Sequence, residues 1–418
     1  MRMKKVLKIL VVSLIALVLV IFVGLHIAYH FFSPNDNEVQ VNETNLGYFQ
    51  DSYDDCRQAF REQARAAADM WDQSKMFSIK VPSNVDTGLY IDILYLPPQH
   101  DSSRLLVLSS GIHGIEAFMG SAFQQFFLEV LLTEEVISDM GVLMIHGINP
   151  YGFKYLRRLT ENNVDLNRGS EIDPTLFNIK NEGYGMVNDF LNPKGKVSKN
   201  SIRNQFFHWA SIINIQKYSM GVLQQAIGQG QYDYPEGIMF GGNDFEPQID
   251  SLSIMLPPFL TPYETILAID LHTGHGERGG LYPLSNALDN PQNLQKTESI
   301  FENYHIAWGD TDETYTTTGG FSDPFLKKLC PDATYLHMTL EWGTSDVHKV
   351  IGSMHLLQNH VMENQGFNHG YKNSRQEERI KQNYKEFFYP SSESWRSGAI
   401  ESGWEMFNSV LENYSVIE

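Results

Sequence analysis

The sequence predicts an α/β fold in which a central mixed sheet carries helices on both faces. Four short apolar runs, at residues 104–110, 141–148, 266–271 and 333–340, have the length of buried strands. They alternate with stretches of helical length at 117–133, 201–227 and 346–364. Strands that alternate with helices in this way are typical of α/β proteins. Polar residues follow several of the runs directly, as expected for a site beyond the carboxyl ends of strands.

The first element is an apolar segment that precedes this fold. Four basic residues within the first eight are followed by the uncharged stretch 9–25. Together with Ile27 and Ala28 it is long enough to span a bilayer, which takes about 20 residues. The basic residues favour a cytoplasmic N-terminus. A cleaved signal peptide is the alternative, although His26-Ile-Ala28 is a weak cleavage site.

The expected domain organisation follows from this segment. Residues 1–30 are predicted to be a single-pass membrane anchor, or a signal peptide, and residues 31–47 a linker. Residues 48–418 are predicted to form one catalytic domain outside the cytoplasm, in the periplasm or at the cell surface. This domain is expected to begin with a helix at 52–71 and a strand at 89–96, and to end in helices from 376 onward. A helical and loop excursion is expected at about 170–262, where a long insertion in a compact domain is often functional.

Metal-ligating residues follow two of the predicted strands. His113 and Glu116 come after the strand at 104–110, with the spacing His-x-x-Glu, and His272 directly follows the strand at 266–271. Two histidines and one carboxylate are a common ligand set for a catalytic zinc ion, which keeps one position open for water. Asp270 is a candidate for orienting a metal ligand without contacting the metal itself, but the sequence leaves this role open.

A second glutamate ends the strand at 333–340. Glu341 precedes Trp342 and Gly343, and it would lie near the metal if its strand neighbours the ligand strands. A carboxylate in that place can take a proton from a zinc-bound water and pass it to a leaving amine. Taken alone, a glutamate at the end of a strand is more often a solvated side chain.

The segment Asp165-Leu-Asn-Arg168 adds groups that can bind an anion. Arg168 can hold a carboxylate through two parallel hydrogen bonds, and Asn167 can bond to the same group. Arg158 is a candidate for stabilising the oxyanion that forms on an attacked carbonyl, and Arg157 competes for that role. The ordered segments together predict a mononuclear zinc hydrolase.

These residues resemble the carboxypeptidase A-like zinc carboxypeptidase superfamily, and in detail a bacterial branch known only as a domain of unknown function. The resemblance begins at about Tyr48 and covers most of the chain. It implies a three-layer α/β/α sandwich with a mixed, roughly eight-stranded sheet, and one Zn²⁺ per chain. It implies that His113, Glu116 and His272 are the zinc ligands and that Arg158 stabilises the oxyanion. It also implies that Asn167 and Arg168 clamp the carboxylate of the substrate and that Glu341 is the general acid/base. The loop Tyr315-Thr-Thr-Thr-Gly-Gly320 resembles the one that carries the substrate-capping tyrosine, which points to Tyr315.

The resemblance implies a metallocarboxypeptidase that hydrolyses C-terminal peptide bonds through a zinc-activated water, and the N-terminal segment adds the expectation that it is membrane-anchored. The chain departs from the digestive members, which carry an arginine between the first two ligands, where this chain has Gly114-Ile115. The sequence Gly-Ile-His-Gly-Ile-Glu116 also resembles the aspartoacylase and succinylglutamate desuccinylase branch. A zinc-dependent deacylase of N-acyl amino acids is therefore an alternative, and a non-catalytic binding module is a third hypothesis. In both enzyme hypotheses the substrate is a peptide or acyl-amino acid with a free carboxylate.

Composition limits the partners. The apolar fraction of 42% is ample for the core of one large domain. The net charge of −19 argues against nucleic acid as a partner. The expected contact with the lipid bilayer is made by the N-terminal helix. Cys56 and Cys330 are too few for a disulfide scaffold, and whether the two pair is left open.

Overall fold

The centre of the protein is one eight-stranded sheet. The structure is a computed structural model that describes residues 2–35, 39–286, 288, 290–309 and 317–417. The strand order is β1-β2-β4-β3-β5-β8-β6-β7. The strands are β1 Lys75–Lys80, β2 Tyr90–Leu96, β3 Arg104–Ser110, β4 Gly141–His146, β5 Thr265–Thr273, β6 Leu281–Ser285, β7 Ala307–Trp308 and β8 Thr334–Trp342.

The four inner strands β4, β3, β5 and β8 run parallel, and antiparallel pairs flank them. Ser110 of β3 is in register with Leu271 of β5, which in turn pairs with Leu340 of β8. The carboxyl ends of these strands therefore lie level at one edge of the sheet. This register places the residues that follow each strand beside one another.

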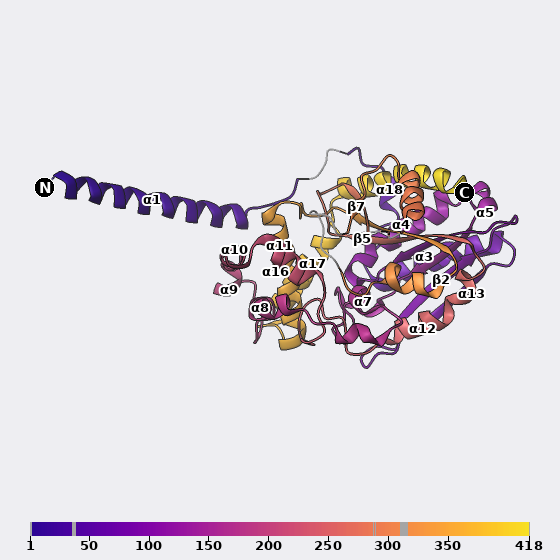
Figure 1. Cartoon of the computed structure of the whole chain (residues 1–418), viewed down its shortest axis with the longest axis horizontal. Helices are drawn as coiled ribbons and strands as arrows, with labels where there is room; N and C mark the ends of the chain where they lie inside the picture. The colour runs from indigo at the N-terminus through magenta and orange to yellow at the C-terminus, as the bar shows by residue number, and fades with distance from the viewer. Residues whose placement is uncertain (1, 36–38, 287, 289, 310–316, 418) are drawn as a thin grey trace.

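Helices cover both faces of this sheet (Figure 1). On one face, side chains such as Leu267, Ile269 and Leu271 pack against α3 Tyr53–Met70, α4 Ala117–Phe126, α14 Pro291–Ile300, α17 Ser374–Phe388 and α18 Glu393–Ser415. On the other face, Ile266 and Ala268 pack against α12 Pro247–Met255 and α13 Pro257–Leu260. Alternation of buried side chains between two faces is what a strand covered on both sides requires. The predicted three-layer α/β fold with a mixed eight-stranded sheet is confirmed.

A lobe of helices lies beside the sheet and contains much of the stretch 170–262. Its members α8 Glu182–Leu191, α10 Phe207–Tyr218, α11 Met220–Gly228 and α16 Val350–His369 pack around a separate apolar cluster. The short helix α9 Ile202–Gln205 directly precedes α10. The helical stretch predicted at 201–227 is divided into α9, α10 and α11, because the chain breaks at Phe206 and again at Ser219, which has a φ of 69°. The helix predicted at 346–364 begins and ends several residues later, as α16.

The remaining helices are short. They are α2 Glu43–Leu46, α5 Glu134–Asp139, α6 Pro150–Tyr155, α7 Leu166–Gly169 and α15 Lys327–Leu329, with 3₁₀ turns η1 Gly114–Glu116 and η3 Pro174–Asn178 and π turns η2 Phe127–Leu131 and η4 Phe321–Leu326. The helix predicted at 117–133 thus divides into α4 and η2. Cys56 and Cys330 are free and buried in the clusters on opposite faces of the sheet, so they do not pair.

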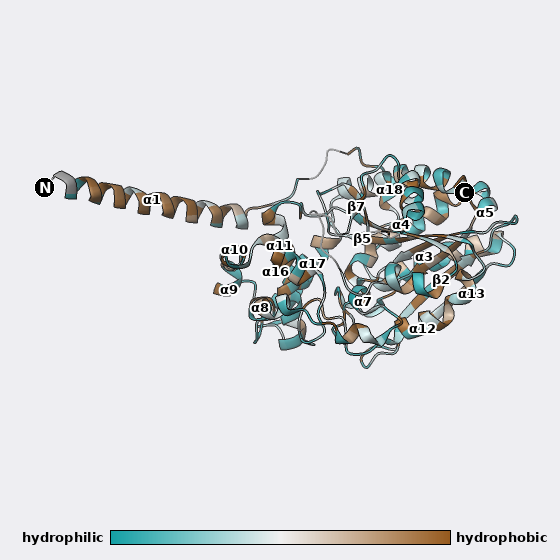
Figure 2. Ribbon diagram, viewed as in Figure 1, coloured by the Kyte–Doolittle hydropathy of each residue, from teal (hydrophilic) through white to brown (hydrophobic). Residues whose placement is uncertain are grey.

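The N-terminal helix α1 Arg2–His30 extends away from the domain, and its surface is predominantly apolar (Figures 1 and 2). Among the described residues, the segment Lys4–His30 is the one helix long and apolar enough to cross a membrane, with a mean hydropathy of 3.2 in its most apolar window. A signal sequence would have the same properties. Only the last turns of α1 meet the domain: the ring of Phe22 stacks on Trp209, with ring centroids 4.4 Å apart.

Candidate active site

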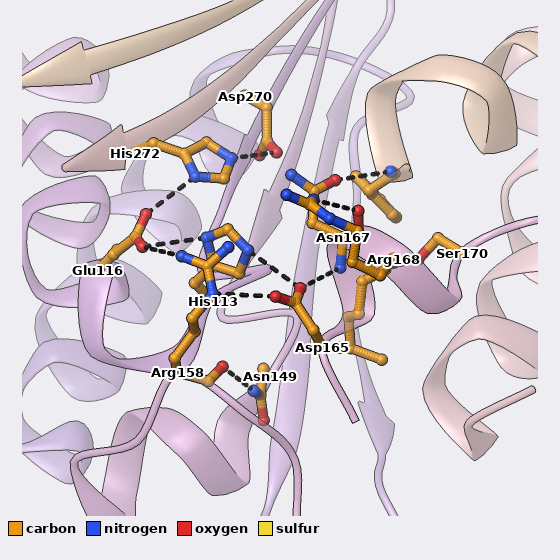
Figure 3. Close-up of polar contacts among 12 residues, drawn as sticks. His113, Glu116, Asn149, Arg158, Asp165, Asn167, Arg168, Ser170, Asp270 and His272 are labelled. Carbon is orange, nitrogen blue, oxygen red and sulfur yellow. Dashed lines mark hydrogen bonds and ion pairs between the residues drawn. The ribbon is translucent and has the colours of Figure 1, made fainter. Parts of the chain in front are cut away.

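Three side chains at the carboxyl ends of β3 and β5 could hold a metal ion (Figure 3). His113 Nδ1 lies 3.0 Å from Glu116 Oε1, and His272 Nδ1 lies 2.9 Å from Glu116 Oε2. All three side chains are buried, and one ligand atom from each lies within 4.8 Å of the others. Two imidazole nitrogens and a carboxylate thus face one point, as the sequence spacing predicted.

The turn between β3 and α4 depends on two glycines. Gly111 has a φ of +76°, and a Cβ there would lie 2.8 Å from the Cβ of Ala117. A Cβ on Gly114 would lie 2.2 Å from the carbonyl carbon of Gly152, a backbone atom that cannot move aside. Close packing against α6 therefore explains why the residue after His113 is glycine in this chain.

In both His113 and His272 the second ring nitrogen, Nε2, contacts the carboxylate of an aspartate. His272 Nε2 lies 2.7 Å from Asp270 Oδ2, and His113 Nε2 lies 3.2 Å from Asp165 Oδ1. A carboxylate in this place fixes the ring orientation and leaves Nδ1 as the ligand atom. The role left open for Asp270 is thus supported by its contact: residues two apart on a strand share a face, so Asp270 reaches His272.

Asp165 connects several parts of the site, which the sequence did not reveal. Its Oδ1 accepts the backbone N–H of Asn167 and so caps α7, and its Oδ2 accepts Nε–H of Arg158 at 3.0 Å. Burial favours a raised pKa for Asp165, but Arg158 and His113 outweigh it and hold the pKa well below its usual value. Asp165 is therefore an anion whose charge is balanced inside the protein.

Electrostatics also separate the two glutamates. Burial would raise the pKa of Glu116, but His113 and His272 hold that pKa below its usual value. Glu341, by contrast, has a pKa raised to about 8, first by burial and then by the negative charge of Glu116. Two carboxylates in one pocket therefore have opposite proton affinities. In general, a carboxylate with a lowered pKa suits a cation ligand, and one with a raised pKa suits proton transfer.

Glu341 lies beside the ligand strand. It pairs with His272 across β5 and β8, so the two side chains share a face of the sheet. Its Oε2 accepts the backbone N–H of His275 at 3.3 Å. Both Glu341 and His275 line the pocket that holds the three ligand candidates.

The two neighbouring arginines occupy different environments. Arg158 lines the pocket, and its Nη1 donates to Glu116 Oε1 at 3.2 Å. Arg157 is buried away from it: Nε donates to Glu363 at 2.6 Å and one Nη to Asn163 at 2.9 Å. Because Arg157 is used in this internal ion pair, Arg158 is the arginine available to a ligand in the pocket.

Asn167 and Arg168 also line the pocket, from the short helix α7. Arg168 Nε donates to the carbonyl of Gly228 at 2.9 Å, and Nη1 donates to the carbonyl of Asn167 at 2.8 Å. Gly230 packs against the Arg168 side chain so closely that a Cβ there would lie 2.7 Å from Arg168 Cδ. The end of α11 and the loop after it thus fix the plane of the Arg168 guanidinium.

The pocket itself has a volume of about 230 Å³ and collects these groups at the carboxyl edge of the sheet. It is also lined by polar residues that no sequence motif indicated, including Asn286, His337 and His360. They come from the segment after β6, from β8 and from α16, and no spacing in the chain relates them. Tyr315, the predicted capping tyrosine, lies outside the described residues.

Comparison with known sequences identifies the family. A family model described as "Protein of unknown function (DUF2817)" matches residues 49–402. The chain belongs to the DUF2817 family. The predicted membership of a branch known only as a domain of unknown function is thereby confirmed. No curated protein sequence matches this DUF2817 protein.

Several solved structures are similar to this DUF2817 protein. One is bovine thrombin-activatable fibrinolysis inhibitor in complex with tick carboxypeptidase inhibitor, with 14% identity and a TM-score of 0.42 over 76% of this chain and 97% of that chain. Carboxypeptidase A from Helicoverpa armigera has 13% identity and a TM-score of 0.41, over 76% and 73% of the two chains. A succinylglutamate desuccinylase from a Silicibacter species has 12% identity and a TM-score of 0.35, over 72% and 68%.

Proposed function

We propose that this protein is a membrane-anchored, extracytoplasmic zinc hydrolase that acts as a carboxypeptidase. The observation that carries the proposal is the cluster of His113, Glu116 and His272, which faces the same pocket as Glu341 and Arg168. These are the groups needed to bind a metal, move a proton and hold a carboxylate. They come from the turn after β3, from β5, from β8 and from α7, and they line one pocket.

The donor set fits zinc. Two imidazoles and one carboxylate leave a fourth position open, as in catalytic zinc sites. His113 Nδ1 is buried and has no hydrogen-bond partner among the described residues, although it faces Glu116. A cation between them would satisfy this atom. When bound, zinc would supply a Lewis acid and lower the pKa of a water molecule toward neutrality.

Glu341 is the proposed general acid/base. Burial raises the pKa of the Glu341 carboxyl above its usual range, which favours uptake of a proton by this carboxylate. Its position in register with His272 brings it within the same pocket as the reacting groups. Glu341 would take a proton from the attacking water and deliver it to the leaving amine.

Two arginines are proposed to divide the remaining work. Arg158, which lines the pocket next to Glu116, would stabilise the negative charge that develops on the attacked carbonyl oxygen. Arg168, with its plane fixed by two backbone carbonyls, would bind the terminal carboxylate of the substrate together with Asn167. Tyr315 is proposed to cap the bound substrate, as the family resemblance implies.

A second candidate function is deacylation of N-acyl amino acids, and an apolar cavity favours it. This cavity has a volume of about 430 Å³ between α8, α10, α11 and α16. It shares His275, Leu356 and His360 with the lining of the catalytic pocket, so the two spaces adjoin. An apolar acyl group beyond the scissile bond would fit there, as would a large apolar side chain of a peptide.

Matched substrates distinguish these functions. The full-length protein in detergent, loaded with zinc, is tested on peptides with free or amidated C-termini and on N-acyl amino acids of increasing chain length. Release of the terminal residue from free but not amidated peptides supports the carboxypeptidase. Cleavage of acyl-amino acids alone supports the deacylase. If neither class is turned over while zinc is bound, both enzyme proposals fail, and His272→Ala serves as the control that lacks zinc in the catalytic site.

The location of the domain is a separate proposal. The basic residues before the apolar part of α1 and its unburied surface support an uncleaved anchor with a cytoplasmic N-terminus. Protease added to spheroplasts should digest the domain but spare a tag at the N-terminus. Protection of the whole domain would reverse the proposed orientation, and a soluble, shortened protein would indicate a cleaved signal peptide.

A further inference from the structure

Three histidines meet where the N-terminal helix joins the domain. His26 and His30 lie on the last turns of α1, four residues apart and therefore on one side of the helix. His208 comes from α10 in the helical lobe. One ring nitrogen from each lies within 4.8 Å of the others, which is the same closeness that His113, Glu116 and His272 show.

The spacing of the nitrogens matches metal ligands. His26 Nδ1 lies 3.3 Å from His208 Nε2. Two nitrogens bound to one tetrahedral zinc ion at about 2.05 Å would be roughly 3.4 Å apart. The ring centroids of His30 lie 4.4 Å from His26 and 5.7 Å from His208, so the third ring adjoins both.

His30 has the outer contact that metal-ligating histidines usually make. Its Nε2 lies 2.9 Å from the carbonyl oxygen of Gln205, so that nitrogen carries the hydrogen and donates it. A backbone carbonyl in this place fixes the tautomer and leaves Nδ1 unprotonated, free to bind a cation. His208 is buried and would bind through Nε2, the nitrogen that faces His26; its other ring nitrogen, Nδ1, has no hydrogen-bond partner among the described residues.

The surrounding contacts hold the three rings in place. Tyr29 is 2% exposed, and its hydroxyl donates to Gln358 Oε1 at 2.7 Å. His355 Nε2 donates to the carbonyl oxygen of Tyr29 at 3.0 Å. Because these bonds dock the last turn of α1 on α16, the histidines of α1 reach His208 without the metal having to order them.

We propose that His26, His30 and His208 form a second metal site, which binds a divalent transition metal and fastens the membrane anchor to the domain. Three imidazoles and no carboxylate favour zinc, copper or nickel over magnesium or calcium, which prefer oxygen ligands. A fourth position is left for water. This site is separate from the catalytic pocket and does not depend on the function proposed for it.

Zinc content tests the proposal. The full-length protein in detergent is dialysed against micromolar zinc, and bound zinc is measured by elemental analysis. We expect two zinc ions per chain in the wild type and one in His26→Asn and in His30→Gln. The matched control is His355→Gln, which removes a neighbouring histidine that is not a proposed ligand, retains an amide N–H that can donate to the carbonyl of Tyr29, and should keep both ions.

Measuring zinc content in a variant that lacks the catalytic metal site distinguishes the two sites. In His272→Ala we expect one zinc per chain, which falls to zero when His30→Gln is added. Because His30 is exposed, this substitution should leave the fold intact, and circular dichroism checks that it does. Zinc content that is the same in the wild type and in both His26→Asn and His30→Gln would overturn the proposal, whatever the catalytic site binds.

Discussion

Asp270 provides the sharpest test of the proposed metal centre. The carboxylate is 1% exposed, with Oδ2 2.7 Å from His272 Nε2 and Oδ1 accepting the hydroxyl of Ser109 at 2.7 Å. Asp270→Asn keeps the size of the side chain but removes the negative charge that polarises His272. Loss of such an outer carboxylate typically weakens metal binding or activity about 10- to 100-fold, which corresponds to about 1.4–2.7 kcal/mol. We expect zinc affinity to fall by that factor.

The assay is competition for zinc with a chelator of known affinity. Ser109→Ala is the matched control, because it removes the neutral partner of the other oxygen and leaves the carboxylate on His272. We expect its zinc affinity to change by less than about threefold. Denaturant unfolding of the metal-free proteins checks that both variants fold. A correctly folded Asp270→Asn protein that binds zinc at the active site as tightly as the wild type would refute the proposed orienting role.

Three further predictions concern the proton carrier, the anion clamp and the stability of the fold. Glu341→Gln should reduce kcat by about 10²- to 10⁴-fold while zinc content stays unchanged, because it removes the proton acceptor and no ligand; loss of zinc in this variant would mean that Glu341 has another role. Arg168→Lys should raise KM about 10-fold or more for substrates with a free carboxylate and leave amidated substrates equally poor, because lysine cannot form two parallel bonds; an unchanged ratio of the two substrates would argue against the clamp. Burial lowers the pKa of His146 from 6.5 to about 4 in the folded protein, so as pH falls the unfolded chain takes up a proton before the folded protein does. The domain should therefore lose up to about 3 kcal/mol of its free energy of unfolding as pH falls from 6.5 to 4. Denaturant titrations at several pH values should show a shallower loss in His146→Gln, and an identical pH dependence would contradict this assignment.

The central strands could be predicted because burial on both faces makes them continuous apolar runs. The same feature placed His113, His272 and Glu341 at strand ends, where parallel register brings them together. Asp270 could have been assigned from the two-residue period of a strand. The carboxylate of Asp165 carried no such signal, because its contacts with His113 and Arg158 depend on how two loops fold over each other.

The strands β6 and β7 and the helix breaks were beyond prediction for the opposite reason. The strand β7 has two residues, and β6 contains Pro283, so neither forms an apolar run. The breaks at Phe206 and Ser219 fall inside an apolar, helix-like stretch and reflect packing of the lobe around its own cluster. Local sequence could not reveal them, because the competing contacts come from α8 and α16.

The contacts of Asp165 have a thermodynamic consequence. One carboxylate backs the ligand His113, pairs with Arg158 and caps the short helix that carries Arg168. A movement of that helix on substrate binding would displace Asp165, which accepts a backbone N–H of the helix, and would thereby displace the ring of His113, which contacts the same carboxylate. Linkage then requires the effect to be reciprocal: if a bound carboxylate tightens the hold on the metal, the metal tightens the hold on the carboxylate by the same factor. The affinity for the metal and the affinity for the carboxylate would thus report a single coupling free energy, transmitted through Asp165.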